Sequence, residues 1–357
     1  MKKKILLGLI LLAFILVGVQ VIPGIADSDG PKEITLTLEQ AVDTAIENNP
    51  MVGMAQADKK KKEVSYKQAK EAGAKIEDSM MEATYEGKIL ARLKPKIAER
   101  EGEQAAKVYD ITINGVKVQA ETAYYSLIQA GEKQIIAGNT LSRADEQLRI
   151  AKLRYDLGTA AKVEVLGAEA GQAAARAGLT AARNDYKQKM LELNKSLAIN
   201  LETPVKTSGE FQFEKEEFLL QDLLDRAMVE DMSIIKAQDA YEMAKWSYDL
   251  VKSLYGSNYY EARKAEQDVV AAQLSLEKTT DEVVTGVHKS YYGSLALEEQ
   301  YQYLLKTVEL KKEAYRLTQL SYENGLAILS EVQEASDALK EAEVNLSDCV
   351  HQYNILK

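Results

Sequence analysis

The sequence repeats itself, and this internal duplication constrains the fold more than any other feature. A shift of 167 residues aligns Tyr124-Tyr125 with Tyr291-Tyr292, Tyr155 with Tyr322, Gly158 with Gly325, Glu164-Val165 with Glu331-Val332 and Tyr186 with Tyr353. Upstream, a shift of 182 residues aligns Leu38 with Leu220, Asp43 with Asp225 and Ser65-Tyr66 with Ser247-Tyr248. Such self-similarity indicates two copies of one structural unit in tandem.

Proline usage and apolar spacing indicate that the unit is built from long helices. The last 153 residues contain no proline, the residue that most often interrupts a helix. Apolar residues recur at steps of three and four, the spacing of a coiled-coil seam. One seam comprises Leu141, Ala144, Leu148, Ala151 and Tyr155, and the next comprises Val165, Ala168, Gln172, Ala175, Leu179, Ala182 and Tyr186.

Strand patterns are nearly absent. The best candidate runs from Tyr109 to Val118 and contains an Asn-Gly pair, which is typical of a hairpin turn. A helix continuing through this stretch is the alternative, and we favour it slightly.

A short break between the two seams predicts an antiparallel helical hairpin. Gly158 supplies the left-handed residue that ends the first helix, and Thr159 or a neighbour can cap the second. The matching seam of the second copy comprises Val332, Ala335, Leu339, Ala342, Leu346, Cys349 and Tyr353. Cys349 is therefore predicted to be a packed seam residue rather than a reactive thiol.

We therefore predict an all-α fold of long antiparallel coiled-coil hairpins in a tandem duplicated repeat. The first repeat covers residues 27–204, with its hairpin tip near 156–160, and the second covers 205–357, with its tip near 323–327. Each repeat opens with a short amphipathic helix, which Asn48-Asn49-Pro50 closes in the first copy. The junction from Glu202 to Gly209 is rich in turn-forming residues.

The N-terminus resembles an export signal. Lys2, Lys3 and Lys4 precede an apolar run from Ile5 to Val19, and small residues follow as far as Ala26. Residues 1–26 are therefore predicted to be a signal peptide, with an uncleaved membrane anchor as the alternative. Either way, we expect an exported protein of the cell envelope.

Several functions are excluded by composition. A single cysteine forbids an internal disulfide, and His288 and His351 lie too far apart in the sequence for a metal-binding motif. The net charge of −10 argues against nucleic acid as a partner. No acid pair is accompanied by a histidine or a Gly-rich loop, so we predict no enzymatic activity, no metal and no cofactor.

Three segments carry a resemblance to a known family. Residues 36–41 through 48–50 (LTLEQA to NNP) resemble the start of the TolC-like outer membrane efflux proteins. Residues 154–160 (RYDLGTA) through 164–169 (EVLGAE) resemble the hairpin tip of that family, and residues 321–325 (SYENG) through 331–335 (EVQEA) resemble a second, weaker copy of it. The similarity covers most of the chain after residue 26.

The resemblance implies a homotrimeric exit duct in the cell envelope. Family members work with a periplasmic membrane-fusion adaptor and an inner-membrane pump, and the adaptor meets the hairpin tips. Carried over by position, the implied docking residues are Tyr155, Gly158, Thr159, Val165, Tyr322, Gly325 and Val332. For the two tyrosines, packing of the hairpin end is the alternative role.

One departure from the family pattern affects the expected fold. The stretches Lys75 to Tyr109 and Tyr255 to Lys278, where the family has transmembrane strands, have the pattern of charged helix. Neither has the alternating apolar residues that a lipid-facing strand needs. We therefore expect a helical duct subunit with little or no β-barrel.

The sequence therefore predicts one of two functions. The first is an exit-duct component of a tripartite efflux or type I secretion system. The alternative is a non-conducting extracytoplasmic coiled-coil adaptor or envelope spacer.

Overall fold

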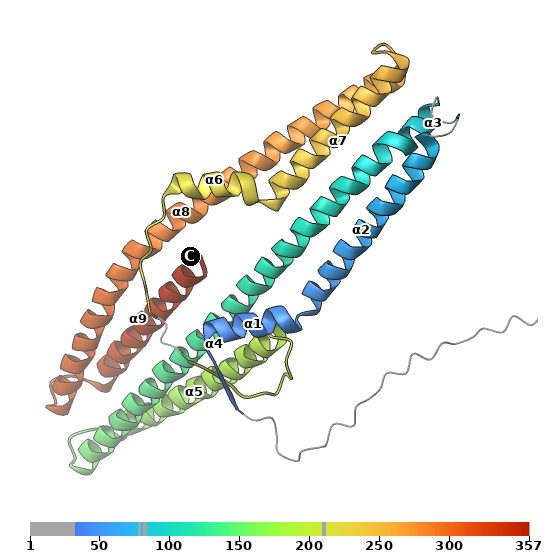
Figure 1. Ribbon diagram of the computed structural model, residues 1–357. Helices are drawn as coiled ribbons and strands as arrows, with labels where there is room; N and C mark the ends of the chain where they lie inside the picture. The colour runs from blue at the N-terminus through green and yellow to red at the C-terminus, as the bar shows by residue number, and fades with distance from the viewer. Residues whose placement is uncertain (1–32, 78–79, 81–83, 209–211, 357) are drawn as a thin grey trace, which may run out of the picture.

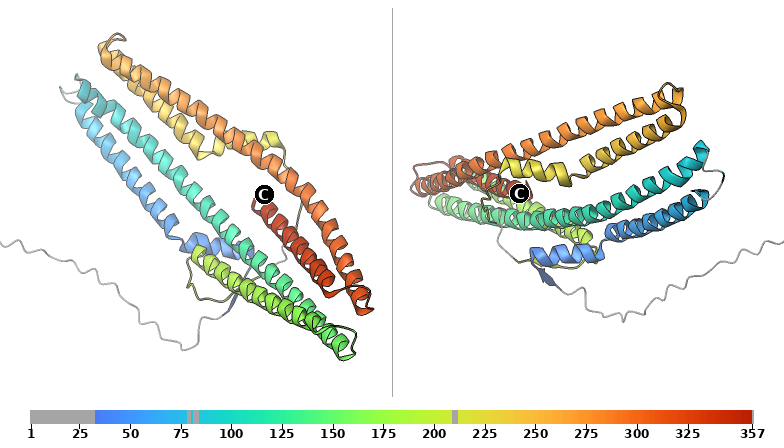
Figure 2. Two further views of the ribbon diagram at one scale, coloured as in Figure 1. Left: turned by 180° about the vertical axis from the view of Figure 1, so that it is seen from behind. Right: turned by 45° about the horizontal axis from the view of Figure 1, so that its top comes forward.

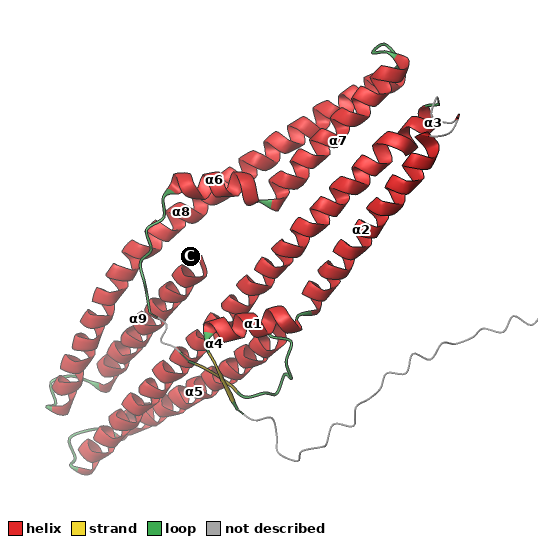
Figure 3. Ribbon diagram, viewed as in Figure 1, coloured by secondary structure: helices red, strands yellow, loops and turns green. Residues whose placement is uncertain are grey.

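The chain is almost entirely helical (Figure 3). The computed structural model describes residues 33–77, 80, 84–208 and 212–356, so the predicted signal peptide lies outside the described residues. The first half contains β1 (Ile34–Leu36), α1 (Leu38–Asn48), α2 (Pro50–Glu77), α3 (Tyr85–Lys88), the π-helix η2 (Ile89–Leu93), α4 (Lys94–Asp156) and α5 (Lys162–Ser196). The second half contains β2 (Val205–Thr207), α6 (Leu220–Glu230), α7 (Met232–Tyr255), α8 (Tyr260–Glu323) and α9 (Leu329–Leu356).

Each repeat is organised around one very long helix. The helix α4 has 63 residues and α8 has 64, so each is about 95 Å long at 1.5 Å per residue. Two shorter helices pack antiparallel on each: α2 and α5 on opposite halves of α4, and α7 and α9 on opposite halves of α8 (Figure 1). The predicted all-α fold of duplicated helical hairpins is therefore confirmed.

The two repeats lie side by side in one elongated, gently curved layer (Figure 2). Beyond its own hairpin partners, α4 packs on α9 in one half of the molecule and on α7 in the other half. In the half that contains the predicted tips, the order across the layer is α5, α4, α9, α8. In this half α5 and α8 are therefore the edges of the layer.

Local sequence signals explain where the first helices begin and end. Thr37 and Gln40 form a reciprocal capping box at the start of α1, in which the Gln40 amide nitrogen donates to Thr37 Oγ1 at 3.2 Å. The helix α1 ends at Asn48 and α2 begins at Pro50, as the Asn-Asn-Pro signal predicted. The stretch from Tyr109 to Val118 lies inside α4, which confirms the continuous helix over the hairpin.

The two charged stretches are helical, but each also contains a chain reversal that the sequence pattern missed. The helix α7 ends at Tyr255 and α8 begins at Tyr260, with Gly256 at φ +81° between them. In the first repeat α2 ends at Glu77 and α3 begins at Tyr85. The chain therefore reverses direction between antiparallel helices at both ends of the layer. Gly256-Ser257-Asn258 is the turn signal that marks the reversal in the second repeat.

In the first repeat, α2 and η2 approach each other closely beside the chain reversal. Gly73 on α2 is buried, and a Cβ at this position would lie only 2.9 Å from the carbonyl oxygen of Ala91 in η2. Glycine is the one residue that lets the two backbones come this close. The π-helical turn of η2 widens the helix at the same place.

The described residues contain one strand pair. Ile34–Leu36 and Val205–Thr207 form a parallel pair in which Ile34 is opposite Val205. Strands this short have no alternation to detect, and the pairing joins the start of the first repeat to the start of the second. It places the start of the interrepeat junction against the first repeat.

The first repeat buries a core where α1 crosses α4 and the end of α5. The buried members of this cluster are Ala41, Ala45, Val116, Ala120, Tyr124, Leu127, Leu193, Leu197 and Val205. The counterpart of α1 in the second repeat, α6, packs mainly on α8 and has no buried residue. The two repeats thus share an architecture but not the same burial.

No helix among the described residues is both long enough and apolar enough to cross a bilayer.

The Tyr124 hydroxyl holds the strand pair against α4, and we expect its removal to be measurable. It lies 3.0 Å from the Leu36 carbonyl oxygen and 2.9 Å from that of Ser208, so it can donate to either. Tyr124→Phe is expected to lower the free energy of unfolding by about 1 kcal/mol, because it removes the hydroxyl donor from these part-buried carbonyls. Urea unfolding measures this change. Tyr291→Phe, at the aligned position of the second repeat, is the matched control, and an equal loss there would contradict the assignment.

Candidate functional site

Both predicted hairpin tips end their long helix with the same backbone motif. Gly158 has φ +72°, its amide donates to the Tyr155 carbonyl at 2.9 Å, and the next amide donates to the Arg154 carbonyl at 2.8 Å. Gly325 has φ +75° with equivalent bonds of 3.0 and 2.8 Å to the carbonyls of Tyr322 and Ser321. This pattern is a Schellman motif, in which the left-handed residue is favourable only for glycine. The predicted role of the two glycines as helix terminators is therefore confirmed.

The predicted cap at Thr159 is wrong in detail. Thr159 Oγ1 donates to the Arg154 carbonyl at 3.0 Å, so this side chain closes the end of α4 rather than the start of α5. The helix α5 has Ala161 at its N-cap and no side-chain cap, whereas Glu331 Oε2 accepts from the Ile328 amide at 3.0 Å at the start of α9. Glu164 lies in the first turn of α5, where the helix dipole favours a negative charge.

Tyr322 joins the two tips. Its side chain is fully buried, and its hydroxyl lies 3.4 Å from Glu164 Oε2 on α5. The Arg154 guanidinium lies over the Tyr322 ring at 4.5 Å from the centroid and donates to the Tyr322 carbonyl at 3.2 Å. Burial, and next the negative charge of Glu164, raise the pKa of Tyr322 above its ordinary value. The hydroxyl therefore stays protonated and available as a donor.

An apolar cluster surrounds this contact. Its buried members are Leu148, Ile150, Ala151, Ala168, Tyr322, Leu329 and Val332, and Val165 packs against them. Three of the predicted docking residues, Tyr322, Val332 and Val165, are thus brought together, but in the interior between the tips. Tyr322 and Val332 are fully buried, so in this chain they support the tips rather than present a surface.

The remaining predicted docking residues lie at the surface. Tyr155 is 46% exposed, in contrast to its aligned partner Tyr322, and Gly158, Thr159 and Gly325 are exposed as well. Exposed apolar side chains that the sequence pattern did not predict surround them: Leu157, Val163 and Leu166 at the first tip, and Leu326 and Ile328 at the second. A leucine beside each tip glycine, in a turn where a polar residue is usual, is the signal that could have revealed them.

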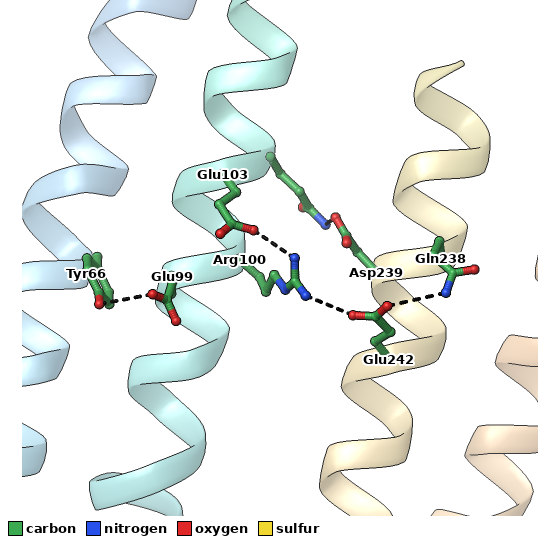
Figure 4. Close-up of polar contacts among 8 residues, drawn as sticks. Tyr66, Glu99, Arg100, Glu103, Gln238, Asp239 and Glu242 are labelled. Atoms are coloured by element: carbon green, nitrogen blue, oxygen red, sulfur yellow. Dashed lines mark hydrogen bonds and ion pairs between the residues drawn. The ribbon is translucent and has the colours of Figure 1, made fainter. Parts of the chain in front are cut away.

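The repeats also meet at the opposite half of the layer through a polar cluster (Figure 4). Arg100 on α4 bridges Glu103, at 2.8 Å, and Glu242 on α7, at 2.9 Å. Gln104 donates to the buried Asp239 at 2.9 Å, and the Trp246 ring lies under the cations of Lys96 and Arg100. These contacts join helices from different repeats, so no local pattern could predict them.

Between the two ends, α4 and α9 form a third polar contact. Asp348 accepts from Gln129 at 2.8 Å and pairs with Lys133 at 2.7 Å. Ser347 donates to Glu132 at 2.7 Å, and Arg143 donates to Ser336 at 3.2 Å. On the same helix Cys349 is 2% exposed, and burial raises the pKa of its thiol, so its predicted place in a packed seam is confirmed.

The geometry defines a duplicated helical-hairpin protein. Its two repeats pack edge to edge, and exposed apolar side chains lie at both hairpin tips. The chain belongs to the outer membrane efflux protein family, whose pattern matches once in each repeat, over residues 87–198 and 244–355. No curated protein matches the chain significantly.

Solved structures show the same fold. The outer membrane protein VceC of Vibrio cholerae is 14% identical with a TM-score of 0.68, over 89% of this chain and 93% of that one. The CmeC outer membrane channel of Campylobacter jejuni is 11% identical with a TM-score of 0.68, over 89% and 83%. The outer-membrane channel OprN is 13% identical with a TM-score of 0.72, over 89% and 87%.

Family membership confirms the resemblance drawn from the tip and N-terminal motifs. The family consists of exported proteins of the cell envelope, as the sequence indicated, and its members are channels rather than enzymes.

The contact between the tips predicts that Arg154 stabilises the fold more than a neighbouring surface arginine does. Arg154→Met is expected to cost about 1.5–3 kcal/mol, because it removes a charged donor from the Tyr322 carbonyl. Arg149→Met, on the same helix, removes only an exposed pair with Glu146 and is expected to leave stability nearly unchanged. Thermal unfolding of both variants tests this, and equal effects would show that the tips are not joined through Arg154.

The helix-ending motif gives a prediction of opposite signs at two sites. Gly158→Ala is expected to destabilise the chain by about 1–2 kcal/mol, because alanine is strained at positive φ. Ala198, which follows α5, already has φ +51° in the same type of turn, so Ala198→Gly is expected to stabilise by about 0.5–1 kcal/mol. Denaturant midpoints compare the two variants, and a neutral Gly158→Ala would rule out the left-handed turn at that tip.

Proposed function

We propose that the chain is the exit-duct component of a tripartite efflux or type I secretion system and assembles as a homotrimer. Family membership supports the duct role, and the resemblance supports three subunits. The observation that carries the proposal is the difference between the two edges of the helical layer. One edge, α8, exposes a stripe of large apolar side chains, and the middle of the other edge, α5, exposes small ones.

The large residues lie along α8. Tyr303, Leu310 and Leu317 are 68%, 66% and 48% exposed and recur every seven residues, which places them in one stripe. The opposite edge, α5, exposes Ala173, Ala177 and Ala181 at steps of four. Large side chains on one helix and small ones on the other allow close helix packing. A contact between two unlike edges is heterologous and closes into a ring when the layer is curved.

The tips supply the proposed docking surface for a periplasmic adaptor. Tyr155, Gly158, Thr159 and Gly325 lie at the surface there, with exposed apolar neighbours of which Leu326, at 84%, is the most accessible. Exposed apolar groups at the end of a charged helical layer favour a protein partner. In this proposal Tyr322, Val332 and Val165 hold the two tips at a fixed separation.

Native mass tests the duct. The chain without residues 1–26, measured by light scattering after size exclusion with and without detergent, is expected to have three times the mass of one subunit. Leu310→Glu is expected to give a monomer of unchanged helical content, because it places a charge in the proposed interface. Lys312→Glu, at an exposed position on the opposite face of the same helix, is the matched control and is expected to stay trimeric.

A monomer in both conditions would contradict the duct. It would favour the alternative of a non-conducting extracytoplasmic adaptor or envelope spacer, which needs no closed ring. A trimer that survives Leu310→Glu would retain the duct but reject the proposed edge contact.

A further inference from the structure

A hollow of about 500 Å³ lies between the two repeats, away from the tips. Helices α4, α8 and α9 form its walls, together with residues 212–213 before α6. The lining is mainly apolar and aromatic: Ile135, Ile136, Phe213, Tyr301, Val308, Leu346 and Val350. Its size lies in the range of small-molecule pockets.

Two carboxylates lie in this mainly apolar lining, together with Gln212 and Ser347. Glu132 on α4 accepts from Ser347 Oγ at 2.7 Å, and burial raises its pKa above the ordinary value. Glu343 on α9 presents an Oε2 atom that is buried and accepts no hydrogen bond among the described residues. A buried acceptor without a donor is unfavourable, so this oxygen is available to a positively charged group.

The cation paired with Glu343 does not give it a hydrogen bond. Arg143 Nη2 lies 3.7 Å from Glu343 Oε2, which is an ion pair without a hydrogen bond. The same guanidinium donates to Ser336 at 3.2 Å and to Thr140 at 3.1 Å. The Arg143 guanidinium therefore donates its hydrogen bonds to Ser336 and Thr140 and leaves Glu343 Oε2 without one.

Aromatic rings lie in the same lining. Phe213 stacks on Tyr301 with ring centroids 4.0 Å apart and planes 9° apart, and it also packs on Tyr353 at 4.3 Å. These stacked rings give the hollow a large, rigid apolar surface. Acids and rings around one apolar space are complementary to a ligand that is both apolar and positively charged.

The duplicated fold does not by itself require this combination. At the aligned positions of the first repeat, Glu343 corresponds to Arg176 and Tyr301 to Gln134. Only one of the two copies thus combines the acid with the aromatic ring.

We propose that this hollow binds hydrophobic organic cations. The apolar and aromatic lining takes the body of the ligand, and Glu343, with Glu132, faces its charge. The site lies within a single chain, so binding does not depend on the trimer or on conduction.

Two probes of the same shape and opposite charge test the proposal. Tetraphenylphosphonium and tetraphenylborate are titrated calorimetrically into the chain without residues 1–26. This truncation keeps every described helix and strand, because the first of them begins at Ile34. Saturable one-to-one binding of the phosphonium is expected, with no binding of the borate at this site. Glu343→Gln is expected to weaken the phosphonium about tenfold, because it removes the charge and keeps the shape.

Matched variants separate the site from general charge effects. Glu341→Gln makes the same change at an exposed position on the same helix and is expected to leave affinity unchanged. Phe213 lies outside the helices, and Phe213→Leu is expected to weaken binding severalfold because it removes aromatic contact area from the lining. The proposal is overturned if the borate binds as tightly as the phosphonium, if Glu341→Gln and Glu343→Gln have equal effects, or if neither probe saturates.

Discussion

The rest of the structure depends on one constraint: each helix can bury its apolar side chains only by packing along neighbouring helices. A helix is too thin to bury a core alone, so α4 and α8 obtain their burial from shorter helices laid along both halves. Small residues such as Ala144, Ala151 and Ala168 let these helices approach closely. Because each long helix is stabilised along its whole length, it can extend about 95 Å without a globular core.

The contacts between the repeats combine apolar packing with polar groups. The apolar cluster at the tips joins residues of both repeats, and three groups of polar side chains also connect the repeats, around Arg154, around Asp348 and around Arg100. Exposed ion pairs contribute little free energy, but their geometry selects one register. Only the first group includes a fully buried partner, Tyr322, so the junction is tightest at the tips.

Duplication has produced positions that are equivalent in sequence and different in environment. Tyr155 and Tyr322 occupy the same place in the same turn, yet one is half exposed and the other is buried. The helix α1 buries Ala41 and Ala45, while α6 buries nothing. The cause is position within the layer: α9 and the tip of the second repeat lie against the first repeat, and each repeat therefore has different neighbours.

The sequence by itself determined the helical class and the two tip turns, because these depend on signals a few residues apart: heptad spacing, glycines at positive φ and the Asn-Asn-Pro stop. It also determined the duplication, from residues aligned at fixed shifts, and the family, from short motifs. It missed the parallel pair of β1 and β2, the reversal at Gly256 and the apolar tip residues such as Leu326. Only the tertiary structure decided that Tyr322 faces Arg154 and Glu164, and that Glu343, Phe213 and Tyr301 line one hollow. These contacts join residues far apart in the chain, and they depend on the register in which the two repeats pack, which local periodicity does not encode.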